Sequence, residues 1–253
     1  MIPEESFLRR IPLAYETQGR MELEAIAFAI DAIYLKHQQI SKWATNCDLG
    51  SFVNTPHHER LDLFLNLWSI VDQADVLRRL LQKIKTNRAV NGFLNIADSA
   101  QRMRNKMDHL SQNIPNIASK TGKVVPVYGV LSFGKFGLSN NGVDVEDFEI
   151  YTITAGSLTH KSHQWPIATP SPGKILEIPV GMFEFSAFDS TLDVSGLVQS
   201  LHHVVQTFET AVRPRIEAKI KSAAEENGLS ADALISECAG SVATVIRGQF
   251  RDS

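Results

Sequence analysis

The sequence predicts an α+β fold, a mainly helical bundle with a β-sheet inserted between its third and fourth helices. Two observations predict this class. Four long segments carry apolar residues at every third or fourth position, which is the spacing of one buried helix face. A stretch between the last two segments is rich in Val, Tyr, Phe and Ile and is broken by glycines and prolines, which favours strands and turns. The chain therefore divides into a helical region at 1–119, a β insertion at 120–190 and a returning helical region at 191–253.

The N-terminal region is expected to begin with two long amphipathic helices. The first runs from about residue 21 to 43 and the second from about 59 to 86. Residues 46–56 contain glycine, asparagine and proline, which break regular structure, so they predict a loop between the helices. The apolar stripes that define the two helices consist of Leu23, Ile26, Ile30, Ile33 and Ile40, and of Leu61, Phe64, Trp68, Val71, Leu77, Leu81 and Ile84.

A third helix is expected to follow a turn at Asn91–Gly92. Its apolar residues recur in steps of three and four from Phe93 to Ile114. Pro115 is expected to end the helix, because proline cannot donate the next backbone hydrogen bond and restricts the residue before it.

The β insertion is predicted from short runs of strand-forming residues. Residues 123–136, 147–155 and 175–188 carry these runs, and the second of them alternates most clearly. Residues 140–142 (Asn-Asn-Gly) indicate a turn, and the prolines of 163–173 predict a loop.

The fourth helix is expected from about 194 to 227. Pro214 is expected to kink it, and the pair Asn227–Gly228 is typical of a helix C-terminus. A short last helix is expected to begin near Ser230.

Composition places the chain among globular intracellular proteins. Hydrophobic residues make up 43% and charged residues 21%, and the net charge of -3 provides no global attraction to nucleic acid. Two cysteines, Cys47 and Cys238, are too few for a disulfide scaffold. The N-terminus lacks the pattern of a signal peptide, and no apolar run approaches the length of a membrane span. We therefore expect a reducing cytoplasmic location and no membrane association.

Charge is distributed unevenly along the chain. Between residues 76 and 109, eight basic residues face only two acidic ones, a local charge of +6. Such a patch can bind phosphates even on an acidic protein, although a solvated helix face has the same composition. The basic residues are Arg78, Arg79, Lys83, Lys85, Arg88, Arg102, Arg104 and Lys106.

The hexapeptide that begins at Arg104 and ends at His109 carries the most specific chemical signal. Histidines have an unperturbed pKa near 6.5, so they exchange protons near neutral pH, and arginine holds a fork of donors for charge on phosphorus. On one straight helix of about 3.6 residues per turn the two side chains point roughly 140° apart. Either the helix breaks near the motif, or a dimer axis assembles the pair, or Arg102 is the partner of His109. The alternative without a catalytic role is a polar helix surface on which the two residues occur by chance.

This pattern resembles the R-x4-6-H motif of the HEPN superfamily of helical ribonucleases, including the frequent Arg-Asn start. The resemblance covers roughly residues 15–115 and the fourth helix, while the β insertion departs from it. It implies a helical bundle, a homodimer whose two motifs meet in a cleft, and endoribonuclease activity without metal or other cofactor. Such proteins act in toxin–antitoxin, antiphage or RNA-processing systems, so RNA and an antitoxin protein are the partners that it implies.

Carried over to this chain, the resemblance makes Arg104, Asn105 and His109 the candidate catalytic residues. The candidate RNA-binding residues are the nearby Arg102, Lys106, Arg78 and Arg79. Some members of the superfamily have lost catalysis, so a non-catalytic dimeric module that recognises RNA, a nucleotide or a protein partner is the second hypothesis. A third is an unrelated helical scaffold, in which His109 would stand isolated in solvent.

Overall fold

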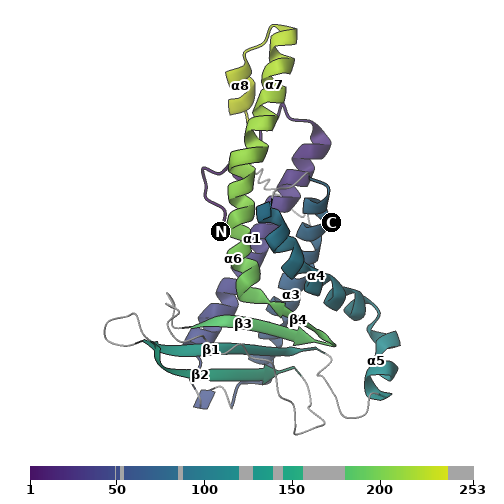
Figure 1. The fold of residues 1–253 in the computed structure, drawn as a ribbon, viewed down its shortest axis with the longest axis vertical. Helices are drawn as coiled ribbons and strands as arrows, with labels where there is room; N and C mark the ends of the chain where they lie inside the picture. The colour runs from purple at the N-terminus through teal and green to yellow at the C-terminus, as the bar shows by residue number, and fades with distance from the viewer. Residues whose placement is uncertain are drawn as a thin grey trace, which may run out of the picture.

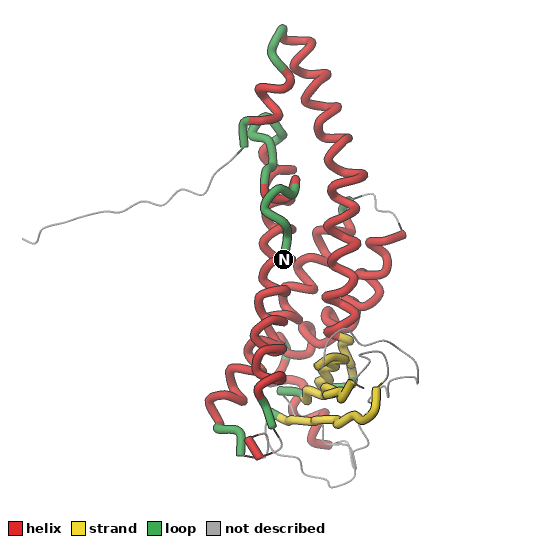
Figure 2. Tube along the Cα trace, turned by 90° about the vertical axis from the view of Figure 1, so that its left-hand side faces the viewer, coloured by secondary structure: helices red, strands yellow, loops and turns green. Residues whose placement is uncertain are grey.

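The computed structural model of this chain describes residues 1–48, 50–51, 54–84, 88–119, 128–138, 145–155 and 180–238. The predicted fold class is confirmed, because the molecule is mainly helical and has one four-stranded antiparallel sheet after its third long helix. The long helices form a column that stands on the sheet (Figure 1). Seen from the side, the strands gather at one end of this column (Figure 2). Within the described ranges, none of the helices is long and apolar enough to cross a membrane.

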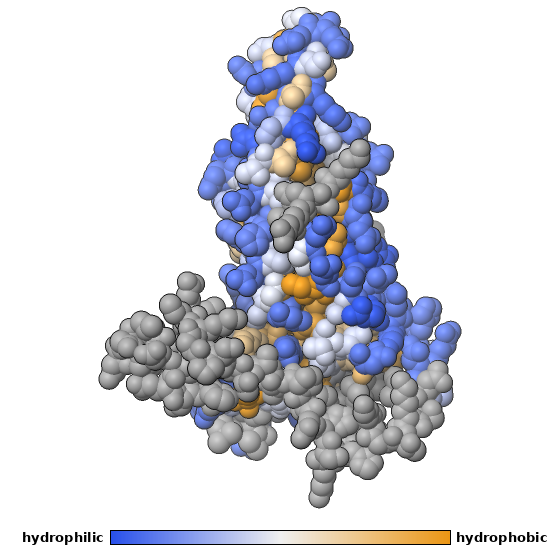
Figure 3. Space-filling view, in the orientation of Figure 1, coloured by the Kyte–Doolittle hydropathy of each residue, from blue (hydrophilic) through white to orange (hydrophobic). Residues whose placement is uncertain are grey.

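The first two predicted helices are α1 (Thr17–Asn46) and α3 (His57–Gln82), which pack against each other. Each is confirmed with its ends shifted by a few residues. The α1 positions that recur at helical spacing, Ile26, Ile30 and Ile33, are fully buried. The face of the column seen in Figure 3 is mostly hydrophilic, with apolar side chains visible along its middle. This is the distribution expected of amphipathic helices.

The predicted turn at Asn91–Gly92 is wrong, because both residues lie inside α4 (Arg88–Asp108). A glycine within a helix costs about 1 kcal/mol relative to alanine. Val90 and Phe93 on either side, however, are almost completely buried. Burying a side chain such as Phe93 contributes about 1.5–3 kcal/mol, so core packing outweighs the local preference for a turn.

The predicted helix end at Pro115 is also wrong. Pro115 lies within α5 (Leu110–Ser119), and the interruption comes earlier, at His109 between α4 and α5. Proline removes one backbone donor from a helix. Both Pro115 and Ser111, whose carbonyl would accept that missing bond, are exposed. Water therefore replaces the lost partner, and the helix continues through the proline.

The sheet consists of β1 (Val130–Leu138), β2 (Val145–Thr154), β3 (Val180–Ala187) and β4 (Ser190–Asp193). Its strand order is β2-β1-β3-β4, and all neighbouring strands are antiparallel. The first three strands were predicted and β4 was not. The predicted turn at 140–142 and the proline-rich loop at 163–173 lie outside the described residues.

The sheet and the helices share one hydrophobic core. Phe133, Phe183 and Phe185 of the sheet are fully buried in the same cluster as the apolar faces of α1, α3 and α4. The Phe185 ring meets the Trp68 ring of α3 edge to face, with centroids 5.4 Å apart. Edge-to-face pairs of this kind contribute beyond the area that they bury. The β insertion is thus packed onto the bundle rather than separated from it.

The fourth predicted helix is a chain of three segments: α6 (Val194–Thr207), a π-helical turn at Phe208–Val212 and α7 (Arg213–Asn227). The π-helical turn lies directly before Pro214, where the α-helical hydrogen-bond pattern cannot continue unchanged. Gly228 ends α7 with a φ of 67°, which confirms the predicted C-terminal stop. Ser230 caps the short α8 (Ala231–Ser236), also as predicted. In Figure 1, α7 and α8 project from the end of the column opposite the sheet.

Candidate functional site

The break between α4 and α5 occurs within the Arg104–His109 motif. His109 is a turn residue whose carbonyl accepts the backbone N–H groups of Gln112 and Asn113, both at 3.0 Å. The Asn113 side chain reaches back and donates to the carbonyl of Lys106 at 2.9 Å. The last carbonyls of a helix lack partners within it, so Asn113 stabilises the end of α4. The regular geometry of α4, in which successive side chains are separated by about 100° around the helix axis, therefore does not extend through His109.

The His109 side chain is exposed at this break. Its ring has no hydrogen bond or ion pair to any residue of the described ranges. The imidazole is consequently accessible to solvent and to a ligand. Asn105, one turn earlier on α4, is exposed as well.

Arg104 is held by a carboxylate buried inside the bundle. Its Nη1 lies 3.1 Å from Oδ2 of Asp75 on α3, and the Asp75 side chain is fully buried. The Nε of Arg104 lies 3.6 Å from Asp72 and 3.9 Å from Asp108, distances of ion pairs rather than hydrogen bonds. Burial raises the pKa of Asp72, and the positive charge of Arg104 opposes that rise. The third terminal nitrogen of Arg104, Nη2, has no partner among the described residues, and the side chain is 28% exposed.

Asp75 also binds the two arginines that follow it on α3. Arg78 donates from Nε and Nη2 to Oδ1 at 3.3 and 3.2 Å, and Arg79 lies 2.6 Å from Oδ2. The Arg78 side chain is only 7% exposed, and its Nη1 lies 3.8 Å from Asp98 on α4. One buried carboxylate therefore holds three guanidinium groups and connects α3 to α4. We call Asp75, Arg78, Arg79 and Arg104 the Asp75 cluster.

The candidate RNA-binding residues are not equivalent in their surroundings. Arg78 is directed into the Asp75 cluster and does not present a free cation at the surface. Arg79 is half exposed but pairs with Asp75. Lys106 pairs with Asp189, which lies in the tight turn between β3 and β4. Arg102 is exposed and donates to the hydroxyl of Ser99 on its own helix at 2.9 Å.

Ion pairing reduces the surplus of positive charge that the sequence indicated. The basic stretch of residues 76–109 begins directly after Asp75, so its local charge of +6 includes neither Asp72 nor Asp75. These two carboxylates and Asp189 reach the basic residues from outside the stretch, while Asp98 and Asp108 lie within it. Among the described residues, four of the five basic side chains around the motif thus pair with acidic ones, and only Arg102 lacks an acidic partner.

Sequence reasoning did not single out Asp75, although a signal for it was present. Asp75 follows Val71 and Ala74 and precedes Arg78 at the spacing of one helix face, and its neighbours on that face are buried. An acidic residue on an apolar helix face must find a cation or protonate, because an isolated buried charge is costly. Such a residue therefore predicts a buried ion pair, but not its long-range partner.

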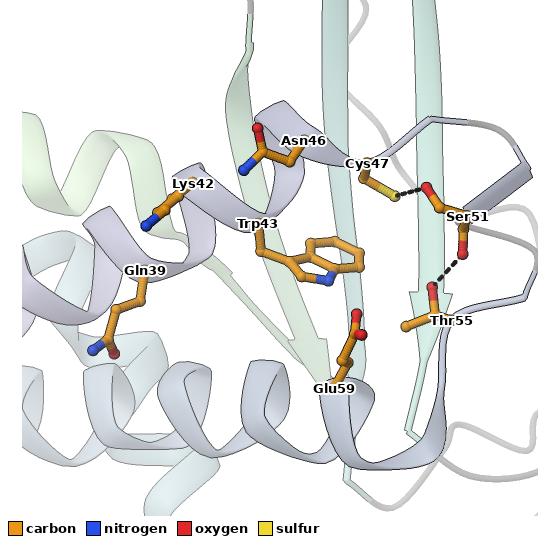
Figure 4. A pocket seen from close by; sticks show the side chains of 8 residues that line it. All are labelled: Gln39, Lys42, Trp43, Asn46, Cys47, Ser51, Thr55 and Glu59. Carbon is orange, nitrogen blue, oxygen red and sulfur yellow. Dashed lines mark hydrogen bonds between the residues drawn. The ribbon is translucent and has the colours of Figure 1, made fainter.

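Two cavities lie away from the motif. One, of about 660 Å³, is a largely apolar groove between the first half of α3 and the sheet, lined by Leu61, Leu65, Trp68 and Tyr128 among others. The other, of about 370 Å³, lies between the end of α1 and the start of α3 and is lined mainly by polar side chains around Trp43 (Figure 4).

No family model, curated protein or solved structure matches this chain.

Proposed function

We propose that this protein is a metal-independent endoribonuclease of the HEPN type, with Arg104 and His109 as its catalytic residues and with toxin–antitoxin or antiphage defence as its setting. The observation that carries the proposal is the helix break at His109, five residues after an arginine that is anchored from α3. Because the helix is broken at His109, the separation of roughly 140° expected on one straight helix does not apply to this pair. Asp75 also holds the guanidinium of Arg104 in one orientation, as a phosphate-binding arginine requires.

Arg104 would bind and stabilise the phosphate. Asp75 fixes the guanidinium through Nη1, while Nη2 remains for an oxygen of the scissile phosphate. Positioned donors of this kind stabilise the charge that develops in the transition state. Asn105, exposed beside Arg104, would contact the same phosphate or the imidazole.

His109 would transfer the protons. As a base it removes the proton of a ribose 2′-hydroxyl, the 2′-oxygen bonds to phosphorus, and the 5′-oxygen leaves and takes up a proton. The products are a 2′,3′-cyclic phosphate and a 5′-hydroxyl. One imidazole cannot remove one proton and supply another at the same moment, so a second group must protonate the leaving 5′-oxygen. A homodimer related by a two-fold axis supplies the His109 of a second copy.

The decisive experiment is incubation of the full chain with total RNA in excess EDTA. The wild type is expected to leave 2′,3′-cyclic phosphate ends and to spare DNA. His109→Ala should lose about 10²–10⁴-fold in rate, and Arg104→Ala about 10²–10³-fold. His203→Ala and Arg215→Ala are matched controls, because both residues are exposed on helices and have no role in the proposed site. Arg102→Ala tests whether Arg102 is the arginine that acts with His109.

Three results would contradict the proposal. These are cleavage that requires a divalent ion, cleavage that His109→Ala retains in full, and a strict monomer by light scattering at micromolar concentration. An effect of Arg102→Ala as large as that expected for Arg104→Ala would transfer the phosphate-binding role to Arg102.

A second candidate function is a non-catalytic HEPN-like module that binds RNA, a nucleotide or a protein partner, such as an antitoxin, through the β insertion. The observation that favours it is the apolar groove, where Tyr128 and Ala155 of the insertion meet the half-exposed Leu61 and Leu65 of α3. The neutralised charge around His109 favours it as well. Binding of RNA without any cleavage in the same assay would support this candidate over the first.

A further inference from the structure

The cavity at the end of α1 has features of a small-ligand site that is separate from the Arg104–His109 motif. It has a volume of about 370 Å³, within the range of about 300–1,000 Å³ typical of ligand pockets. Residues of α1 line one side, Glu59 of α3 lies opposite, and the Trp43 indole lies between Lys42 and Glu59 in the view of Figure 4.

Several polar groups in this cavity have no partner within the described ranges. The Glu59 carboxylate, the Lys42 ammonium and the Asn46 amide are exposed at the mouth of the cavity and form no hydrogen bond or ion pair there, and neither does the indole N–H of the half-buried Trp43. The polar side chains on the other side are engaged with one another, since Ser51 bonds to Cys47 and Thr55 donates to the carbonyl of Ser51. The unpartnered groups therefore gather around the Trp43 ring.

Trp43 provides an aromatic surface in a fixed position. Its ring is half buried and packs edge to face on Phe133 of the sheet, with centroids 6.0 Å apart. An indole held in this way offers a face on which a planar ring can stack, and the stacking of bases on aromatic side chains is a general means of binding them. Burial raises the pKa of the Cys47 thiol at the edge of the cavity, which favours its neutral form.

We propose that this cavity binds a guanine nucleotide, with the base stacked on Trp43 and paired to Glu59. Guanine presents two adjacent N–H donors, at N1 and at its exocyclic amine, which match the two oxygens of one carboxylate. Adenine and cytosine each offer only an exocyclic amine, and uracil offers a single ring N–H. Lys42, at the other side of Trp43, contacts the phosphate.

The charge of the cavity favours a nucleotide over an organic cation. Lys42 and Glu59 bring one positive and one negative charge, so a ligand with a neutral base and an anionic phosphate complements both. A polyamine would satisfy Glu59 but would be repelled by Lys42. The guanine can belong to a free nucleotide or to single-stranded RNA, because both present the same base.

The test is calorimetric titration of the full chain with GMP, AMP, CMP and UMP, followed by a guanylate pentanucleotide and spermidine. We expect GMP to bind most tightly and UMP most weakly. Glu59→Gln should weaken guanine binding about tenfold or more, the discrimination typical of one bidentate contact, and should reduce the preference over UMP. Asp62→Asn is the matched control, because Asp62 is an exposed acid three residues further along α3 and does not line the cavity. Trp43→Phe keeps a ring against Phe133 and should weaken binding of every base.

The arms of the experiment distinguish the source of the guanine. GMP binding that depends on Glu59 supports a free-nucleotide site, and Glu59-dependent binding of the pentanucleotide alone supports an RNA site. Failure of both to bind, a GMP affinity unchanged in Glu59→Gln, or binding of spermidine in place of GMP would overturn the proposal. Thermal melting of each variant separates loss of binding from loss of fold. The result does not depend on RNA cleavage, so it stands or fails separately from the proposed ribonuclease.

Discussion

Replacement of Asp75 by asparagine tests the most consequential interaction in the bundle. Asparagine conserves the volume of the side chain but removes the charge that holds Arg78, Arg79 and Arg104. Arg78 is the critical partner, since its side chain is only 7% exposed and would be left as a poorly compensated buried cation. Removing one partner of a buried ion pair typically costs about 3–5 kcal/mol.

The expected magnitude follows from the exposure of each arginine. The Arg79 side chain is 55% exposed, so its pair contributes only about 0–1 kcal/mol. Asp98, at 3.8 Å from Arg78, compensates part of the lost charge. We therefore expect Asp75→Asn to lower the free energy of unfolding by about 3 kcal/mol, at the lower end of the buried range. For a domain of this size that corresponds to a melting temperature lower by about 6–12 °C.

The assay is urea unfolding of the wild type, Asp75→Asn and two comparison variants. Asp72→Asn removes a half-exposed carboxylate from the same helix and should cost less than about 1 kcal/mol. The double variant Asp75→Asn with Arg78→Met removes both buried charges and should recover part of the loss. A loss below about 1 kcal/mol for Asp75→Asn, or a double variant less stable than Asp75→Asn alone, would refute the reasoning.

Two further predictions concern pH and the β insertion. Burial between α1 and the sheet, where its ring meets Phe183, lowers the pKa of His37 below the ordinary 6.5. As the pH falls, the unfolded chain binds a proton at His37 before the folded protein does, so the free energy of unfolding decreases below about pH 6.5. Across this range the urea midpoint of His37→Gln should fall less than that of the wild type. The exposed His58→Gln should behave as the wild type. An excised fragment of residues 120–190 should not fold, because the inner aromatic side chains of its strands, which also stack on one another, need the helices to complete their burial. A cooperative thermal transition in the isolated fragment would contradict this.

Much of the architecture follows from local sequence patterns. The helical stripes of α1, α3 and α6 and the strand-forming runs of β1 and β2 lie where their periodicity indicated. The two errors in helix ends have different reasons. Gly92 continues a helix because packing of Val90 and Phe93 outweighs the local preference for a turn, whereas Pro115 is tolerated because it lies on an exposed surface.

The candidate site was only partly predictable. The types and spacing of Arg104 and His109 are visible in the sequence, and their spacing is compatible with a helix break near them. The break itself involves the side chain of Asn113 and the backbone of Lys106, a contact that no propensity encodes. The basic stretch was visible too, but its neutralisation depends on carboxylates that lie outside it.

By itself, the sequence determined which segments form helices and strands, because hydrophobic periodicity and turn residues act over a few positions. Only the tertiary structure decided which charges meet. Asp75 and Arg104 are 29 residues apart, and Lys106 and Asp189 are 83 residues apart. Their pairing depends on how α3, α4 and the β3–β4 turn pack together. An ion pair forms wherever the fold brings two charges within a few ångströms, and Coulomb attraction depends on that distance rather than on separation along the chain.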